Sequence, residues 1–191
     1  MQGYDPRDVG AEMVMTPRIL LRAWRPADRD AFAALNADPV VMEHFPGTAS
    51  RTVSDAFVDM IEAEFATEGF GLWAVEIPGV TQFAGFTGLH RVPWEAHFTP
   101  AVEIGWRFAK AHWGHGYATE AAREALRRGF DDHGLEEIVS FTVPANRRSW
   151  RVMERIGMTR DPVDDFDHPR LPEGHRLRRH VLYRIRRPAL S

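Results

Sequence analysis

Two adjoining stretches of this sequence contain residues that could do chemistry: a strand with one carboxylate, and a turn with two glycines. Apolar and polar residues alternate from Ala101 to Phe108, which predicts a half-buried strand with Glu103 and Gly105 on the same face. Apolar residues then recur with helical spacing from Ala118 to Phe130. The chain must turn between these two elements at Gly114-His115-Gly116.

This turn has the features of an anion site. Glycine adopts backbone angles that other residues resist, and it lets the backbone approach a ligand closely. The first N–H groups of the next helix and the positive end of its dipole face outward, which suits phosphate. Alternatively, the glycines only make a tight strand-to-helix connection. A P-loop is excluded because Gly-Lys-Ser/Thr is absent, and the dinucleotide fingerprint because Thr119 stands where a third glycine is needed.

Three motifs follow one another along the chain: VEIGW (Val102–Trp106), WGHGYATEA (Trp113–Ala121) and NRRSWRVMERIGM (Asn146–Met158). Together they resemble the GNAT superfamily of acetyl-CoA-dependent N-acetyltransferases. The resemblance covers nearly the whole chain and is greatest to the Rim-type branch, the ribosomal-protein N-terminal acetyltransferases. The sequence departs from the family at Ala111, where Gln or Arg is usual, and at Met153, where many members have a tyrosine general acid.

The resemblance implies one mixed α/β domain. Its central sheet would be mixed and mostly antiparallel, and the fourth and fifth strands, here 101–108 and 138–143, would splay apart. Acetyl-CoA would lie in that gap, with its pantetheine arm along the fourth strand and its pyrophosphate at the glycine turn. The implied cofactor-binding residues are Trp106, Arg107, Phe108, Trp113, Gly114, His115, Gly116, Tyr117, Ala118, Thr119 and Asn146.

Acetyl transfer from a thioester to an amine needs an unprotonated amine, a polarised carbonyl and a proton for the departing thiolate. Glu103 is the candidate base, acting through a water molecule. Alternatively, Glu103 only pairs with an arginine such as Arg107. Direct attack by the amine fits the absence of cysteine from the chain.

The candidate acid follows from the resemblance. Met153 has no proton to give, but Ser149 matches the residue that Rim-type enzymes are thought to use near the thiolate, and Asn146 matches the pantetheine contact. Asn146 and Ser149 are also ordinary residues for a helix cap and a first turn. Tyr117 is a second candidate donor.

Two loops are candidates for contacts with the acceptor amine. Trp94, His97 and Phe98 lie in the stretch before the central strand, where they either form a wall of the acceptor pocket or pack against the sheet. The acidic run Asp164-Asp165-Phe166-Asp167 would suit a cationic acceptor, or it is a solvated loop. Arginines at 147, 148, 151 and 155 would either meet cofactor phosphates or face solvent.

The surrounding pattern predicts the elements that position these residues. We expect a loose tail at 1–14, an acetyltransferase domain at 15–187 and a short tail at 188–191. A helix should begin near Asp28, and a long helix capped by Ser50 should turn Val53, Phe57, Met60, Ile61, Glu64 and Phe65 to one face. A short helical piece is expected through Val41 and Met42, and later helices at 117–134 and 147–156. Strands are expected at 18–22, 72–77, 82–90, 101–108, 138–143, 158–163 and 180–186.

Composition excludes several classes of protein. The chain has 191 residues, 44% hydrophobic and 27% charged, which is enough for a real core. Its net charge of −3 gives no general attraction to nucleic acid, and it has no cysteine for disulfides or Cys–metal sites. No apolar run is long enough to span a membrane, the first residues lack the pattern of a signal peptide, and the histidines lack the spacing of a metal site. We expect a cytoplasmic monomer or homodimer.

The sequence therefore predicts an acetyl-CoA-dependent N-acetyltransferase that acts on a primary amine, with a protein or peptide N-terminus as the expected acceptor. One alternative is a module that binds acyl-CoA with little turnover. Another is an acetyltransferase for small molecules such as polyamines or aminoglycosides.

Overall fold

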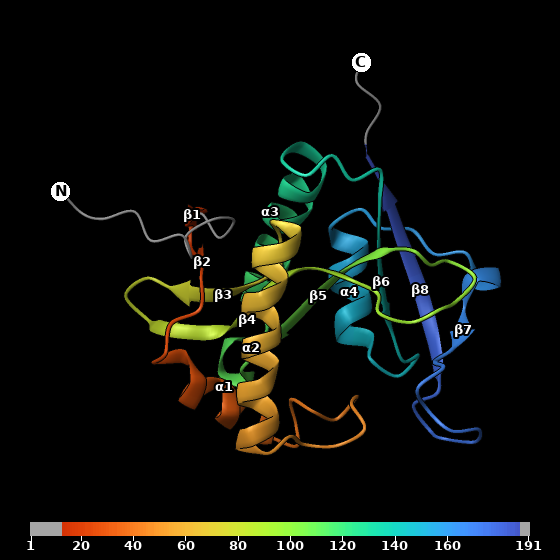
Figure 1. The fold of residues 1–191 in the computed structure, drawn as a ribbon, viewed down its shortest axis with the longest axis horizontal. Coiled ribbons are helices and arrows are strands. Elements are labelled where there is room, and N and C mark those ends of the chain that lie inside the picture. Colours follow the sequence, from red (N-terminus) through yellow and green to blue (C-terminus); the bar gives the residue numbers. More distant parts are fainter. Residues whose placement is uncertain (1–12, 188–191) are drawn as a thin grey trace.

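The strand that carries Glu103 lies in the middle of one mixed sheet. In the computed structural model, which describes residues 13–187, eight strands run in the order β1-β2-β3-β4-β5-β6-β8-β7 (Figure 1). Their bounds are β1 Val14–Met15, β2 Leu20–Arg22, β3 Leu72–Ile77, β4 Thr81–Arg91, β5 Val102–Phe108, β6 Glu137–Thr142, β7 Phe166–Asp167 and β8 Arg179–Arg186.

The sheet is divided between β5 and β6. These two strands are parallel and their register consists of one pair, Glu103 opposite Val139, whereas the other neighbouring strands pair antiparallel. Just beyond that pair, the Ser140 hydroxyl donates a 2.9 Å hydrogen bond to the carbonyl of Ile104. β5 then continues to Phe108 without a partner on this side, which confirms the predicted splay and the mixed, mostly antiparallel sheet.

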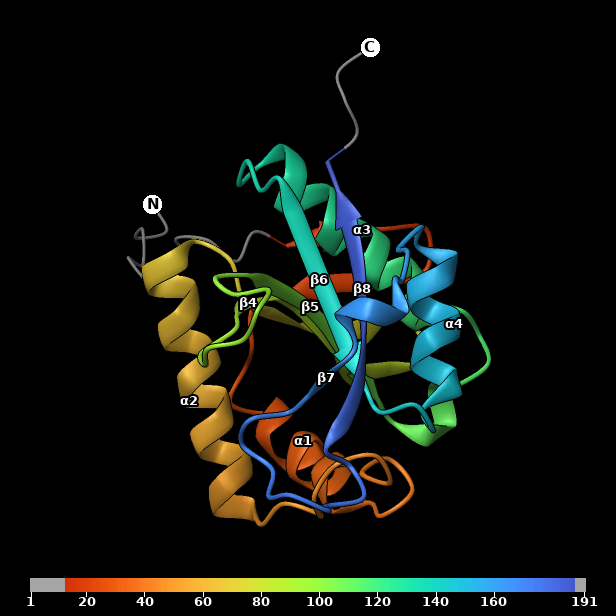
Figure 2. The ribbon, with the colours of Figure 1, turned by 90° about the vertical axis from the view of Figure 1, so that its right-hand side faces the viewer.

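Helices cover both faces of the sheet. They are α1 (Asp28–Ala37), α2 (Arg51–Glu68), α3 (Tyr117–Asp131) and α4 (Arg147–Arg155), and Figure 2 shows α2 on one side of the strands and α3 and α4 on the other. α1 and α2 pack on the β4 face that carries Phe86, whose ring lies 5.8 Å from Phe32 and 6.0 Å from Phe57. α3 packs on the opposite face: a Cβ added at its Gly129 would lie 2.8 Å from the Leu89 side chain.

Helix α2 begins and ends as predicted but turns a different face inward. The Ser50 side chain accepts a hydrogen bond from the Val53 N–H, and Gly69 after the last turn has a φ of 75°. Val53 and Met60, which we expected to face the core, are 59% and 48% exposed. The buried residues are Ser54, Val58, Ile61 and Phe65. The Ser54 hydroxyl accepts a bond from Asn36 of α1, so contact with α1 sets the rotation of the helix.

Three other expectations differ from the structure. Residues 41–42 form turns rather than a helical piece. The strand expected at 158–163 is a single bridge, Thr159 opposite Arg184, followed by the 3-10 helix η3 (Pro162–Asp164), because proline has no N–H to continue a ladder. Val14, inside the expected tail, pairs with Leu21 in β1; residues 1–12 and 188–191 of the expected tails lie outside the described range.

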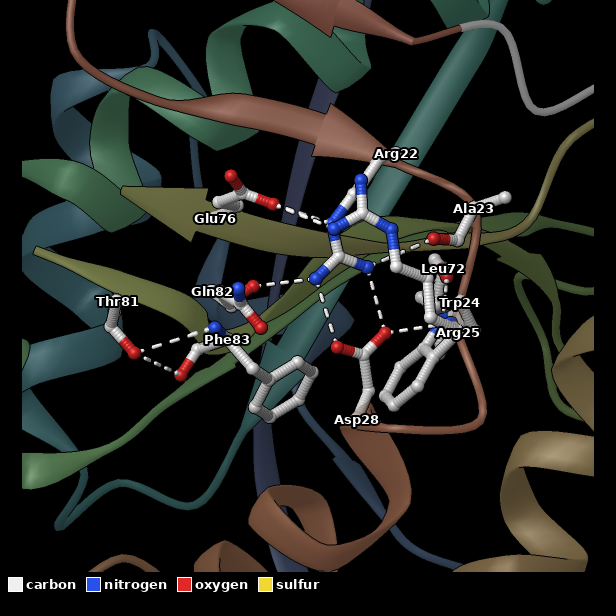
Figure 3. A network of polar contacts seen from close by, with 10 residues as sticks. All are labelled: Arg22, Ala23, Trp24, Arg25, Asp28, Leu72, Glu76, Thr81, Gln82 and Phe83. Atoms are coloured by element: carbon white, nitrogen blue, oxygen red, sulfur yellow. Dashed lines mark hydrogen bonds and ion pairs between the residues drawn. The ribbon is translucent and has the colours of Figure 1, made fainter. Parts of the chain in front are cut away.

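A buried ion network joins β2, β3 and α1 (Figure 3). The side chains of Arg22 and Asp28 are each 3% exposed, and Arg22 donates to both oxygens of Asp28, at 2.7 and 2.8 Å. Its remaining N–H groups donate to Glu76 at 2.9 Å and to the carbonyls of Ala23 and Gln82. The protein thus supplies a partner on every side of this cation.

Candidate active site

A cavity of about 980 Å³ opens where β5 and β6 separate. Its floor is the outer half of β5, and its walls come from β4, β6, the first turn of α3, α4 and the 40–46 turn. Glu103, Gly105, Trp106, Arg107, Phe108, Trp113, Gly114, Gly116, Tyr117, Ala118, Thr119, Asn146 and Ser149 all line it. The structure therefore brings together all but one of the expected catalytic and cofactor residues; His115 is not in this lining.

Glu103 is paired with a histidine, not with Arg107. Its Oε2 lies 2.9 Å from Nε2 of His90, which faces it across the β4–β5 register, and the other ring nitrogen of His90 lies 3.2 Å from the Arg91 carbonyl. A carbonyl and a carboxylate only accept hydrogen bonds, so both contacts are made together when the imidazole is protonated. Burial opposes this charge, but the hydrogen bond to Glu103 and the charges of Glu103 and Glu64 raise the pKa of His90 above its ordinary value.

A second carboxylate completes the surroundings of His90. Glu64, on α2, accepts a 3.3 Å hydrogen bond from the Arg91 N–H through Oε1. Its Oε2 is buried and has no hydrogen-bond partner among the described residues. Burial raises the pKa of Glu64, although the charge of His90 opposes that shift. The imidazole is therefore flanked by two acidic groups, of which only Glu103 lines the cavity.

The glycine turn has the geometry of an anion site. Gly114 and Gly116 have φ values of 81° and 84°, in the left-handed region that favours glycine. The first hydrogen bond of α3 runs from the Glu120 N–H to the Gly116 carbonyl, so the N–H groups of residues 117–119 have no acceptor within the helix. We expected Trp113 among the cofactor-binding residues of this turn. Its backbone N–H instead donates to the Lys110 carbonyl of the 3-10 helix η2 (Lys110–His112).

Two arginines flank this turn. Arg18 donates a 2.9 Å hydrogen bond to the His115 carbonyl, and it forms an ion pair with Glu120 at 2.6 Å. Arg148, on α4, lies over the Trp113 ring, with its guanidinium carbon 4.4 Å from the ring centroid. Arg151 and Arg155 also line the cavity from α4. The helix terminus and these cations together make a positive rim suited to phosphate groups.

The edge of β5 is open where a thioester arm would lie. Toward β6 it has no strand partner past Ile104, whose carbonyl accepts the Ser140 hydroxyl. An extended, amide-containing arm can bond to such an edge as an added strand. The free edge and the positive rim fit the pantetheine and phosphates of acetyl-CoA.

Asn146 and Ser149 are held to each other at the start of α4. The Asn146 side chain accepts from the Ser149 N–H at 3.3 Å, and its amide donates at 3.0 Å to the hydroxyls of Ser149 and Thr142. Both hydrogens of the amide are thus used within the protein. The Ser149 hydroxyl accepts one of them, so its own proton is available to a group in the cavity. Met153, 1% exposed, offers no such proton.

Trp94, His97 and Phe98 lie behind the cavity wall. They are outside the cavity lining and contact a separate cluster, in which the ring centroids of Trp94 and Phe141 are 5.5 Å apart and those of Phe98 and Phe166 are 4.9 Å apart. Phe141 and His168 from this cluster do line the cavity. Burial, followed by the charges of His180 and Arg170, lowers the pKa of His168 to about 4, so its imidazole is neutral at pH 7.

Sequence reasoning missed two groups in the site. His90 was read only as a strand end, although an antiparallel register that pairs Glu103 with residue 90 would have indicated it. The long loop between β4 and β5 hides that register in the sequence. Arg107 was expected as a cofactor-binding residue or as a partner of Glu103, but its side chain lines the cavity and bonds to Asn36 instead of Glu103. Within residues 13–187, no group of His, Asp and Glu side chains is arranged to hold a metal ion, and no helix is long and apolar enough to cross a membrane.

Known proteins resemble this chain in sequence. Residues 18–159 match the model of the acetyltransferase (GNAT) domain. An uncharacterized protein of Bacillus subtilis, YkkB, is 34% identical over 146 residues, which cover 76% of this chain and 84% of that protein. FsC-acetyl coenzyme A-N(2)-transacetylase of Aspergillus fumigatus is 28% identical over 179 residues, covering 85% of this chain and 74% of that enzyme.

Solved structures agree with these sequence matches. A GNAT-family acetyltransferase from Bacillus anthracis superimposes with a TM-score of 0.75 at 27% identity, covering 92% of this chain and 98% of that one. Mycobacterium smegmatis RimJ in complex with CoA-disulfide, at 21% identity, shares the fold with a TM-score of 0.69 and coverage of 92% and 86%. The chain therefore belongs to the GNAT family of acetyl-CoA-dependent N-acetyltransferases.

Proposed function

We propose that this protein transfers an acetyl group from acetyl-CoA to a primary amine by direct attack, with Glu103 as the base and Ser149 as the acid. The observation that carries the proposal is that both side chains line one cavity, Glu103 from β5 and Ser149 from the first turn of α4. The acyl donor supplies a reactive thioester there, and the chain supplies the proton transfers.

The two proton transfers belong to opposite ends of the reaction. Glu103 takes a proton from the ammonium or amine of the acceptor, directly or through a water molecule. As the nitrogen–carbon bond forms and the carbon–sulfur bond breaks, the Ser149 hydroxyl gives its proton to the departing sulfur and recovers one from solvent. His90 acts as a positioning residue, because its hydrogen bond fixes the Glu103 carboxylate.

The acceptor is an α-amino group of a peptide or small molecule. An α-amine has a pKa near ~8, so it needs less help from a base than a lysine amine near ~10.4. The fungal relative is named as an acetyl coenzyme A-N(2)-transacetylase, which agrees with transfer of the acetyl group to a nitrogen. A module that only binds acyl-CoA is the second candidate, since Met153 stands where many relatives have the acid.

Free thiol released from acetyl-CoA tests the proposal. The protein is incubated with acetyl-CoA and a panel of N-terminal peptides, amino acids, polyamines and aminoglycosides, and each product is checked for one added acetyl group. We expect thiol release that depends on an amine. Retention of acetyl-CoA without thiol release for every amine class would instead identify the binding module.

A further inference from the structure

The side chain of Arg107 is a cation in the cavity with few partners. It extends from the same β5 face as Glu103, and its one hydrogen bond among the described residues is a 2.5 Å contact from Nη1 to Oδ1 of the Asn36 side chain. The guanidinium carbon lies 4.2 Å from the ring centroid of Phe45 and 5.3 Å from that of Phe86. Its Nε is buried without a hydrogen-bond partner in the described chain.

The surroundings of Arg107 disfavour its charge. Burial lowers its pKa to about 10, and no acidic residue opposes that shift. Removing a guanidinium from water costs free energy unless ion pairs or hydrogen bonds replace the lost hydration. Aromatic faces and a single amide replace only part of it. Arginine commonly binds a carboxylate through two parallel hydrogen bonds, and its Nε and one Nη can donate them. The Nε of Arg107 has no partner within the described residues.

The cavity as a whole has an excess of positive charge. Of the residues that the structure describes, Glu103 is the one acidic residue in the lining, and His90 already pairs with it. The lining also contains Arg107, Arg148, Arg151, Arg155 and Arg170. Three of these arginines lie on α4 at the phosphate end, whereas Arg107 lies beside α1 and the 40–46 turn.

The acidic run that suggested a cationic acceptor does not face the cavity. Asp164 pairs with Arg184 at 2.7 Å, Asp165 with Arg160, and Asp167 with Arg178 and Arg179 at 3.4 and 3.5 Å. None of these aspartates lines the cavity. Among residues 13–187, therefore, no free carboxylate lines the site to hold a polyamine or an aminoglycoside.

The β5 strand sets the distance between the base and the cation. Glu103 and Arg107 are four residues apart on one face, which separates their Cα atoms by roughly 13 Å at about 3.3 Å per residue. Gly105 lies between them and leaves the strip open. An acceptor that lies along β5 between Glu103 and Arg107 could contact both side chains. Its amine would lie at Glu103 and a negative group, separated from the amine by a spacer, would lie at Arg107.

We propose that the acceptor is an amine that also carries a carboxylate, several bonds away, and that Arg107 binds this carboxylate while the amine lies beside Glu103. The inference rests on the proposed acetyltransferase function and narrows its substrate class. A short peptide, with its α-amine at one end and its carboxylate at the other, meets this description. A polyamine does not.

Kinetics with matched acceptors test the assignment. Thiol release is measured at saturating acetyl-CoA for glycine and for the glycine peptides from diglycine to pentaglycine, and for the C-terminal carboxamide of each one. The wild type should prefer the carboxylate over its carboxamide by at least about tenfold in kcat/KM, the scale of one charge-assisted pair, and the preference should peak at an intermediate spacer. The difference should lie mainly in KM.

Variants at Arg107 separate the inference from a general charge effect. Arg107→Gln should bring the carboxylate and carboxamide series together while acetyl-CoA affinity and melting temperature stay normal, and Arg107→Lys should restore part of the preference. Arg127→Gln, on the outer face of α3, removes a charge elsewhere and should retain the full preference.

The outcomes distinguish the two proposals. Equal rates for carboxylates and carboxamides in the wild type, or a preference that persists in Arg107→Gln, would overturn the inference and leave the acetyltransferase function standing. No thiol release with any amine would overturn the proposed function, and the inference with it.

Discussion

Arg22 and Arg107 are both arginines held inside the protein, but their surroundings differ. Arg22 has a carboxylate on two sides, and carbonyl oxygens take its remaining N–H groups (Figure 3). Arg107 has one amide, two aromatic rings and a free Nε beside an open cavity. A buried charge is stable when its partners are in place. The difference indicates that Arg22 serves the fold, whereas Arg107 keeps part of its binding capacity for a ligand.

The largest expected effect comes from breaking the closed network. Arg22→Met leaves Asp28 buried without its counter-charge, so we expect the free energy of unfolding to fall by about 3–5 kcal/mol. Denaturant unfolding monitored by circular dichroism measures it. Arg107→Met is the matched variant: it should leave that free energy within about 1 kcal/mol of the wild type, or raise it, because it removes an uncompensated cation.

The two changes in the free energy of unfolding test whether Arg22 and Arg107 have different roles. Equal destabilisation by both variants would show that Arg107 is as much a part of the fold as Arg22. In that case the open cavity would need another explanation.

The glycine turn offers a second test on the ligand side. Gly116→Glu adds bulk and a negative charge where the pyrophosphate is expected, so acetyl-CoA affinity should fall by more than about tenfold in calorimetry. Gly116→Ala is the control, since it introduces the same strain at a φ of 84° without the charge. If both variants lose affinity equally, strain rather than phosphate binding explains the effect.

The His90–Glu103 pair should stabilise the fold in a pH-dependent way. Because the folded-state pKa of His90 is raised, its contribution is fully present below the ordinary value of ~6.5 and is lost as pH rises through the folded pKa. His90→Gln should therefore cost roughly 1–2 kcal/mol at pH 6 and less at pH 9. Groups that act on His90 are Glu103, Glu64 and the Arg91 carbonyl.

His133 is the control for this pH series. Burial lowers its pKa, so its contribution has the opposite sign and should rise with pH. A cost of His90→Gln that did not change between pH 6 and pH 9 would mean that the imidazole bonds Glu103 as a neutral group.

The smallest expected effect concerns the segment that braces the phosphate turn. The Thr16 hydroxyl donates to Glu120 at 2.6 Å. Burial alone would raise the pKa of Glu120, but hydrogen bonds from Thr16 and Arg18 lower it. Thr16→Val should cost about 1 kcal/mol at pH 7, and less as pH falls through the pKa of Glu120. Thr67→Val, which loses only hydrogen bonds within its own helix, should lower the melting temperature less. An equal fall for both variants would show that the Thr16–Glu120 hydrogen bond does not stabilise the turn.

Much of the fold could be predicted from periodic patterns in the sequence. The alternation from Val102 to Phe108 and the alanine stripe of α3 each bury one face, so both were found. Caps at Ser50 and Asn146 fixed where two helices begin. The rotation of α2 was wrong because a polar contact between Ser54 and Asn36 overrides the apolar stripe.

The site was harder to predict, since its residues meet through long-range pairing. His90 reaches Glu103 only through the β4–β5 register, which a ten-residue connection conceals in the sequence. The role of Arg107 depends on which carboxylates are missing around it, and a sequence does not show which of its 27 acidic residues are already paired. The aromatics of the 94–98 loop were found as a group, but packing placed them behind the wall.

Turnover of Glu103→Gln tests the central claim, that the cavity performs base-assisted acetyl transfer, most directly. This variant keeps the shape and loses the base, so acetyl-CoA affinity should be unchanged while kcat at neutral pH falls by about 10²-fold or more. The loss should shrink as pH rises, because the amine is then neutral in solution, whereas Ser149→Ala should gain nothing from alkali until the thiolate can leave unprotonated. Full kcat for Glu103→Gln at neutral pH would contradict the account and reduce the carboxylate to a structural partner of His90.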